Sequence, residues 1–305
     1  MAVDVLLAID QGTSSSRAIG FSAAGELIAM EQQPFEQIYP SPGWVEHNAE
    51  VIWSSVLSTT RRVLERLREA GGTVVAVGIT NQRETTVLWD RRSGKPIHNA
   101  IVWQDRRTAD RCRELDRTHA PSELSRKTGL LFDPYFSATK IAWILDRVPG
   151  ARDAAKAGHI AFGTIDSFLL WRLTGGRLHA TDATNASRTA LYDIRRGRWD
   201  EALCEMFRVP AACLPEVRDS AGDFGTIDPS VLGAELPVAG DLIAGQRVLA
   251  EIYREAAVAG QVLLPDRVLL APCRQLLRAE LPDRVEQQVP GPVPVGAARI
   301  DPEHH

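Results

Sequence analysis

Residues 9–17 read Ile-Asp-Gln-Gly-Thr-Ser-Ser-Ser-Arg, and this stretch decides how the chain begins to fold. One apolar run, Val5 to Ile9, leads into it, and a second, Ala18 to Phe21, follows it. Both runs are too short for helices, so the pattern predicts two strands joined by a tight turn. Gly12 lets the backbone come close to a ligand. An ordinary polar hairpin is the alternative interpretation.

The turn carries groups that suit an anion and a hard metal ion. The hydroxyls of Thr13, Ser14, Ser15 and Ser16, together with the nearby amides, can donate hydrogen bonds to phosphate oxygens. Asp10 stands at the end of the first strand, and its carboxylate is the kind of oxygen ligand that Mg²⁺ prefers. The stretch therefore indicates a phosphate-binding turn with a metal ligand beside it.

The composition bounds the class of protein. A length of 305 residues allows one large domain or two smaller ones, and the net charge of -4 comes without the basic stripe of a nucleic-acid-binding surface. No apolar stretch approaches the roughly 18 residues of a membrane span, and the N-terminus does not resemble a signal peptide. The four cysteines show no CxxC spacing, which argues against a zinc site or a disulfide framework. We therefore expect a cytoplasmic protein.

The pattern along the chain predicts strands first and then strands alternating with helices, which is an α/β architecture with a mixed sheet. The opening hairpin is expected to continue into a third strand at residues 26–32. Asn48 is expected to cap a helix that ends at Gly71-Gly72. A buried strand is predicted at 74–79, a pair of strands at 85–89 and 97–103, and helices at 106–115, 138–148, 167–173 and 248–258.

Six polar residues, 81–86, directly follow the buried strand, at a position where open α/β sheets commonly build their sites. Within them Arg83 offers a fork of donors and Glu84 an acceptor, a combination that can bind adjacent hydroxyls of a polyol. A surface ion pair is the alternative. Trp103 can stack on a carbon skeleton or belong to the core, and Tyr135 offers a further hydroxyl.

The composition changes after about residue 240. Residues 247–305 contain seven arginines, seven prolines and no lysine. A genuine linker and tail is one interpretation, and a segment foreign to the preceding fold, such as one from a shifted reading frame, is the other. We expect residues 1–245 to form one substrate- and phosphate-binding domain and residues 246–305 to be a poorly ordered tail.

Together these stretches resemble the glycerol kinases of the FGGY carbohydrate kinase family, from about residue 5 to about residue 240. The matching stretches are 9–17, 35–40, 42–47, 78–86, 99–104, 135–144 and 181–189. The resemblance implies a ribonuclease-H-like (actin-like ATPase) N-terminal domain. It also implies ATP-dependent phosphorylation of glycerol to sn-glycerol 3-phosphate with Mg²⁺, and a homo-oligomer for an intact member of the family.

The resemblance also assigns roles to individual residues. Thr13, Ser14 and Ser15 would hold the nucleotide phosphates, Arg17 would approach ADP, and Asp10 would lie near the metal. The substrate glycerol would be bound by a second set of residues, namely Arg83, Glu84 and Tyr135 at its hydroxyls and Trp103 at its carbons.

The sequence departs from the family where the catalytic base is expected. The family has Gly-Asp-Gln-Gln there, with its Asp as the base, whereas this chain has Gly240-Asp241-Leu242, so Asp241 is the residue that could stand in as the base. The later Gly-Thr-Gly motif does not occur, so the second domain is expected to be missing and kinase activity to be low or lost. A kinase for another small polyol or sugar, and a non-catalytic polyol-binding remnant, are the competing hypotheses.

Overall fold

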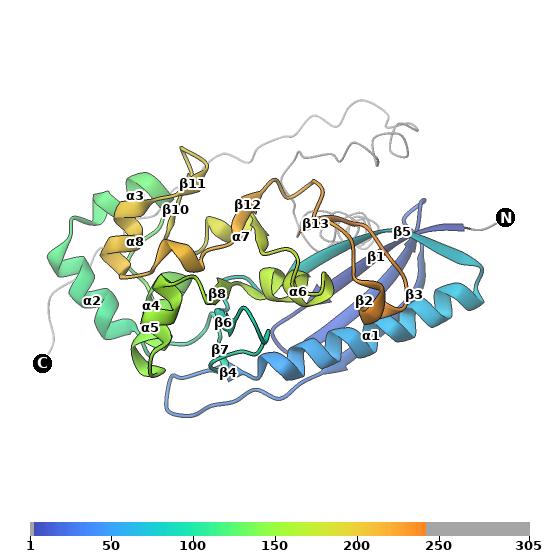
Figure 1. Cartoon of the computed structure of the whole chain (residues 1–305), viewed down its shortest axis with the longest axis horizontal. Coiled ribbons are helices and arrows are strands. Elements are labelled where there is room, and N and C mark those ends of the chain that lie inside the picture. The colour runs from blue at the N-terminus through green and yellow to red at the C-terminus, as the bar shows by residue number, and fades with distance from the viewer. Residues whose placement is uncertain (1–2, 242–305) are drawn as a thin grey trace, which may run out of the picture. The chain divides into compact units, whose positions relative to one another are not determined.

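The computed structural model describes residues 3–241 of the chain (Figure 1). The predicted helix at 248–258 and the predicted tail at 246–305 lie outside the described residues. The strands are β1 (Val3–Gln11), β2 (Ser15–Ser22), β3 (Leu27–Pro34), β4 (Glu46–His47), β5 (Gly72–Asn81), β6 (Val87–Asp90), β7 (Ala100–Ile101), β8 (Ile160–Gly163), β9 (Ala180–Asp182), β10 (Tyr192–Asp193), β11 (Arg198–Trp199), β12 (Glu216–Arg218) and β13 (Val238–Asp241). The helices are α1 (Ala49–Glu69), α2 (Ala109–Thr118), α3 (Pro121–Thr128), α4 (Ser137–Arg147), α5 (Ala151–Lys156), α6 (Ile165–Leu173), α7 (Ala183–Ala186), α8 (Glu201–Phe207), the 3₁₀ turn η1 (Ala211–Cys213) and α9 (Pro229–Leu232).

The largest sheet has five strands in the order β13-β5-β1-β2-β3 and is mixed (Figure 1). Antiparallel ladders join β1 to β2 and β2 to β3, which confirms the predicted three-strand meander. On the other side of β1, β5 and β13 run parallel to it. The carboxyl ends of β1, β5 and β13 therefore lie at one edge of the sheet, and the predicted α/β architecture with a mixed sheet is confirmed.

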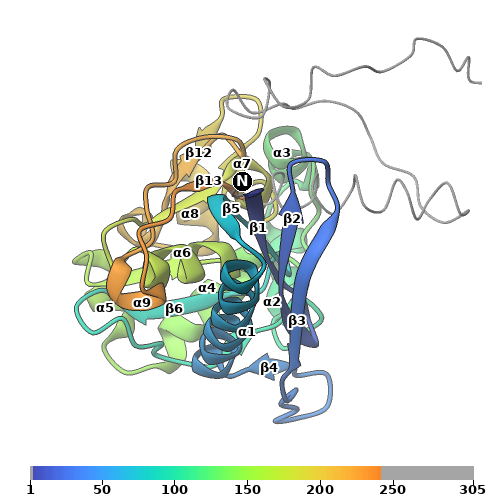
Figure 2. The ribbon, with the colours of Figure 1, turned by 90° about the vertical axis from the view of Figure 1, so that its right-hand side faces the viewer.

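Helix α1 packs along one face of this sheet (Figure 2). As predicted, Asn48 caps it, because the Asn48 Oδ1 accepts from the amides of Glu50 and Val51 at 2.9 and 3.4 Å. Leu67 of α1 lies directly over Gly20 of β2, where a built Cβ would come within 2.7 Å of the Leu67 Cδ2. A side chain at position 20 would therefore require the buried Leu67 side chain to move.

Two large clusters of buried apolar side chains stabilise the described residues, and a small third one consists of Ala8, Ile19 and Phe21. The first lies between the sheet, α1 and α6, and it includes alternate residues of β1. The second joins β6 and β8 to α4, α5 and α8, which gather toward the left of Figure 1. Among residues 3–241, no helix is both long and apolar enough to cross a membrane.

Two predicted elements differ in the structure. The segments predicted as strands at 85–89 and 97–103 pair antiparallel at the Thr86–Ile101 bridge and through the Ile97 amide, which donates to the Leu88 carbonyl at 2.9 Å, but they form no continuous ladder. The ladders of β6 and β7 are formed with β8 and β4. The helix predicted at 106–115 begins at Ala109, since Arg107 is fully buried and forms a hydrogen-bonded ion pair with Asp105 at 2.8 Å. A buried charge needs such a partner, and here the pairing holds Arg107 outside the helix.

Candidate functional site

The turn after β1 is attached to the turn after β5 by buried side-chain amides. The Gln82 Nε2 donates to the Gln11 Oε1 at 3.1 Å and to the Gly12 carbonyl at 3.3 Å. It also lies 3.2 Å from the Nδ1 of His47, a buried ring whose pKa burial lowers to about 4. The imidazole is therefore neutral at pH 7 and acts as a fixed hydrogen-bonding group rather than a charge.

A further amide fixes the tip of the first turn. The Gln37 Nε2 donates to the Thr13 carbonyl at 2.9 Å, and the Gln37 Oε1 lies 2.5 Å from the His47 Nε2. The backbone of the Gly12–Ser15 turn closes on itself as well, because the Gly12 amide donates to the Ser15 carbonyl at 2.9 Å. The turn is consequently held from both strand ends, which is the rigidity that a phosphate-binding loop requires.

The four hydroxyl residues of this turn are not equivalent. Ser14 is exposed, and its hydroxyl has no partner among residues 3–241. Thr13 is half-buried, whereas Ser15 is buried and its Oγ accepts from the Gln32 Nε2 at 2.8 Å. Ser16 faces helix α1, where it accepts from the Ser55 hydroxyl at 2.8 Å, so its predicted contribution to phosphate binding is wrong.

Asp10 and Arg17 face each other across the β1–β2 ladder, with 3.6 Å between the Asp10 Oδ2 and the Arg17 Nη1. Burial raises the pKa of the Asp10 carboxyl, and the Arg17 charge opposes that rise. The Nε of Arg17 is buried and has no hydrogen-bond partner among the described residues. The Asp10 carboxylate thus forms an ion pair with the Arg17 Nη1, while the Arg17 Nε–H makes no hydrogen bond within the described residues.

Glu84 lies in a strained turn after β5. Its φ of 60° is in the left-handed region, which a residue with a side chain adopts only when the surroundings impose it. The residue is 3% exposed in this turn, and its Oε1 accepts from the Nε of Arg188 at 2.6 Å. Burial raises the pKa of the Glu84 carboxyl, and Arg188, Lys140 and Arg83 oppose that rise.

Trp103 connects the two turns. Its indole Nε1 donates to the Thr13 Oγ1 at 3.0 Å, and its backbone amide donates to the Thr85 Oγ1 at 3.3 Å. Its ring meets the ring of Tyr135 edge-on at 5.5 Å. Trp103 is half-buried and belongs to none of the apolar clusters, so it lies between the two turns rather than in the core.

The structure therefore brings together most of the residues that the sequence singles out. Thr13, Trp103 and Tyr135 are in direct contact, and Arg83 and Glu84 follow Gln82, which bonds to Gly12. The guanidinium of Arg83 and the hydroxyl of Tyr135 have no hydrogen-bond partners within residues 3–241. These are free donors beside a buried carboxylate, an arrangement that can bind neighbouring hydroxyl groups.

Asp241 lies at the end of β13, and its backbone pairs with Ile79 of β5. Asp10 of β1 pairs with Thr80 of the same strand, on its other side. Two strand spacings separate the backbones of Asp10 and Asp241, which amounts to about 10 Å. The structure describes the backbone of Asp241 but not its side chain.

Two charged residues near the site were given no role from the sequence. Lys140 is fully buried in α4; its Nζ donates to the Tyr135 carbonyl at 2.6 Å, and burial lowers its pKa to about 7. Its position four residues before Ile144 places it on the buried face of α4, and that spacing could have revealed it. Arg188 gave no such signal, because its partner Glu84 lies 104 residues away in sequence.

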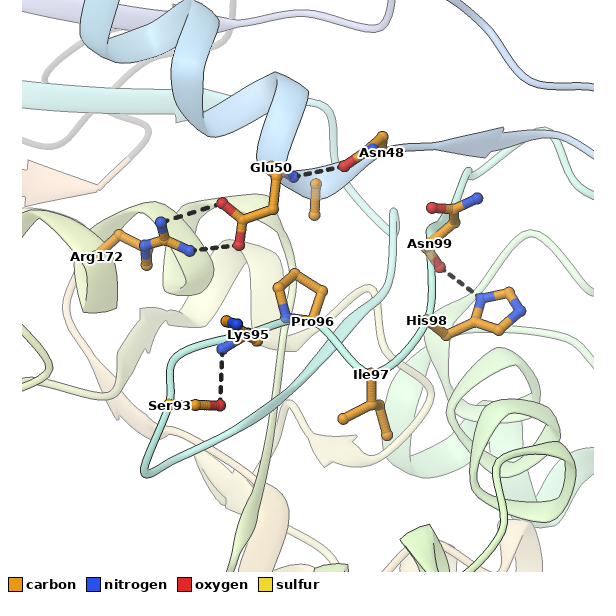
Figure 3. A pocket seen from close by; sticks show the side chains of 10 residues that line it. Asn48, Glu50, Ser93, Lys95, Pro96, Ile97, His98, Asn99 and Arg172 are labelled. Atoms are coloured by element: carbon orange, nitrogen blue, oxygen red, sulfur yellow. Dashed lines mark hydrogen bonds and ion pairs between the residues drawn. The ribbon is translucent and has the colours of Figure 1, made fainter.

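A pocket of about 500 Å³ lies elsewhere, at the start of α1 (Figure 3). Its polar groups are largely paired with one another: Arg172 binds both carboxylate oxygens of Glu50, at 2.7 and 3.1 Å, and Asn48 binds the Glu50 amide. None of the residues predicted for the site lines this pocket.

The comparisons with known proteins agree with the fold. Residues 5–243 match the N-terminal domain of the FGGY family of carbohydrate kinases, and the chain belongs to this family. More particularly, it is 60% identical over 235 residues to a glycerol kinase from Rhodospirillum centenum, covering 77% of this chain and 47% of that protein. A glycerol kinase from Methylobacterium nodulans is 55% identical over 259 residues, 85% of this chain and 51% of the relative.

Solved structures of kinases share the fold. The crystal structure of Plasmodium falciparum glycerol kinase with ADP has a TM-score of 0.77 and 32% identity, over 79% of this chain and 48% of that one. The xylulose kinase from Rhodospirillum rubrum, at a TM-score of 0.71 and 21% identity over 78% of this chain and 48% of that one, shares the fold. The chain thus spans about half the length of the relatives it matches.

Proposed function

We propose that this chain contributes the substrate half of a glycerol kinase site, which phosphorylates glycerol to sn-glycerol 3-phosphate at the expense of ATP. The observation that carries the proposal is the position of Trp103, which donates to Thr13 of the hydroxyl-rich turn and packs against Tyr135 beside Glu84. The phosphate-binding turn and the hydroxyl-binding cluster share this tryptophan. They can therefore hold the phosphoryl donor ATP next to the phosphoryl acceptor glycerol.

In this proposal the polyol is bound between the free donors and the buried acceptor. The Arg83 guanidinium and the Tyr135 hydroxyl donate to glycerol oxygens, and the Glu84 carboxylate accepts from its hydroxyls. Trp103 offers its exposed ring surface to the carbon atoms. The high identity to glycerol kinases supports glycerol over a larger sugar.

The residues present also fit a nucleotide and its metal ion. The unused Nε of Arg17, the unpartnered hydroxyl of Ser14 and the half-buried Thr13 can donate to phosphate oxygens, with Ser15 supporting the turn. Asp10 fits the single protein carboxylate that Mg²⁺ often takes alongside phosphates. ATP would supply the phosphoryl group; these residues would orient it, and the Arg17 guanidinium together with Mg²⁺ would offset its charge.

Asp241 is the proposed base that accepts the proton of the attacking hydroxyl. Its backbone lies at the same edge of the sheet as that of Asp10. It pairs with Ile79 of β5, two residues before Asn81, where the turn to Glu84 starts. The proposed domain boundary at residue 245 also stays a prediction.

The proposal can be tested by measuring glycerol-dependent ADP production in a coupled assay. Because the chain spans half of its relatives, residues 1–241 are joined to the remaining half of the Rhodospirillum centenum protein and compared with the chain alone. We expect the chimera to phosphorylate glycerol in preference to other small polyols and pentuloses, and the chain alone to show little activity. A chimera that folds but shows no glycerol dependence, or prefers another polyol, would contradict the proposal.

A further inference from the structure

Arg188 contacts two of the residues proposed to bind the polyol. It follows α7, and its Nε donates to the Glu84 Oε1 at 2.6 Å. Its guanidinium carbon lies 5.5 Å from the ring centre of Tyr135 and 5.0 Å from that of Phe136. One planar cation therefore touches both the acceptor carboxylate and the aromatic ring of the candidate site.

The backbone around Arg188 is fixed to the elements that carry those residues. Asn185, three positions earlier, accepts at its Oδ1 from the Nδ2 of Asn81, three positions before Glu84, at 3.1 Å. One residue after Arg188, the Thr189 carbonyl accepts from the Ala138 amide in the first turn of α4 at 2.9 Å. The segment that carries Arg188 is thus attached to the end of β5 and to α4.

Glu84 depends on this contact more than on any other. Within residues 3–241, Arg188 makes the one hydrogen bond to the Glu84 carboxylate. The remaining nearby cations do not bind it: Lys140 donates to the Tyr135 carbonyl, and the Arg83 guanidinium has no partner in the described part of the chain. Glu84 is buried, with 3% of the residue exposed, so its carboxylate would rotate or take up a proton if it lost this hydrogen bond.

We propose that Arg188 is a positioning residue of the polyol site, which holds the Glu84 carboxylate and the Tyr135 ring ready to receive substrate hydroxyls. This inference rests on the proposed function. It makes Glu84 a preset acceptor: the turn fixes its backbone at a positive φ, and Arg188 fixes its carboxylate. The alternative is an ion pair that stabilises the fold and has no effect on binding.

The test is calorimetric titration of glycerol into the purified chain and its variants. We expect Arg188→Met to weaken glycerol binding by about 10- to 100-fold, the range implied by the loss of a hydrogen bond to a charged group. Arg188→Lys, which retains a cation near Glu84, is expected to recover part of the affinity. Arg195→Met is the matched control, because it removes an exposed arginine from the neighbouring turn.

A double-mutant cycle separates positioning from simple stability. On a Glu84→Gln background, Arg188→Met is expected to cause little further loss of affinity, because its partner is already changed. Unfolding midpoints are measured in parallel, and Arg188→Gln replaces Arg188→Met if the latter does not fold. Wild-type affinity in Arg188→Met, or equal losses on both backgrounds, would overturn the inference alone. Absence of glycerol binding by the wild-type chain would instead overturn the proposed function and the inference with it.

Discussion

Replacing Lys140 by Met is expected to stabilise the chain at neutral pH, and the gain should disappear at alkaline pH. The Lys140 side chain is fully buried, and burial lowers its pKa from 10.5 to about 7. Below about pH 7 both the folded and the unfolded chain hold this proton, so the whole cost of burying the charge is present. Between about pH 7 and 10.5 the unfolded chain holds the proton and the folded chain does not, so wild-type stability rises with pH.

The size of the effect follows from the pKa shift. At about 1.4 kcal/mol per unit, a fall from 10.5 to about 7 corresponds to roughly 5 kcal/mol of destabilisation at low pH. Losing the bond from the Lys140 Nζ to the Tyr135 carbonyl costs about 1–3 kcal/mol, so the net gain in Lys140→Met is about 2–4 kcal/mol at pH 6. Methionine fills the same elongated space.

The assay is urea unfolding of wild type and variant from pH 6 to 9.5. The difference in unfolding free energy should shrink by about 1.4 kcal/mol per pH unit above pH 7. Lys95→Met, which removes an exposed lysine, serves as the control and should follow wild type. A difference that does not change with pH, or that grows as pH rises, would refute the reasoning.

Three further predictions concern stability. Gly20→Ala should destabilise the chain by about 1–3 kcal/mol, because the new Cβ would meet Leu67 at 2.7 Å, whereas Gly222→Ala, with its nearest contact at 3.5 Å, should be nearly neutral in chemical denaturation. Arg208→Gly should stabilise the chain by about 0.5–1 kcal/mol and so raise its thermal midpoint, because Arg208 ends α8 at a φ of 58°, a conformation that glycine adopts at lower cost. A lower midpoint would contradict this. His47→Asn should reduce the loss of stability on acidification. The His47 pKa is about 4 in the folded chain against 6.5 in the unfolded one, so between these pH values only the unfolded chain binds a proton at this ring. If wild type and variant lose unfolding free energy equally as the pH falls, measured by urea unfolding, the prediction is wrong.

The parts of the fold that the sequence predicts are those set by neighbours in the chain. The hairpin after Ile9 and the cap at Asn48 follow from residues a few positions apart, and both are present. The pairing expected between 85–89 and 97–103 is present only in part, at Thr86 and Ile101 and at Leu88 and Ile97. The ladder of β6 with β8, about 70 residues farther on, could not be read from local pattern.

The same limit applies to the site. Thr13, Arg83 and Glu84 stand at strand ends in recognisable strings, so the sequence could single them out. Arg188 becomes significant only when folding brings it to Glu84. Ser16 belongs to the same string as Thr13, yet strand alternation turns it toward α1, where it bonds Ser55.

The most direct test of the shared site is the indole signal of Trp103 in two-dimensional nitrogen–proton NMR spectra, assigned with Trp103→Phe. This N–H donates to Thr13 and its ring touches Tyr135, so it reports on both the phosphate turn and the polyol cluster. Glycerol and ADP, titrated separately, should each shift this signal in a saturable way, while the signal of the fully buried Trp89 stays in place. If neither ligand moves the Trp103 signal, the two turns do not form one site for a polyol and a nucleotide.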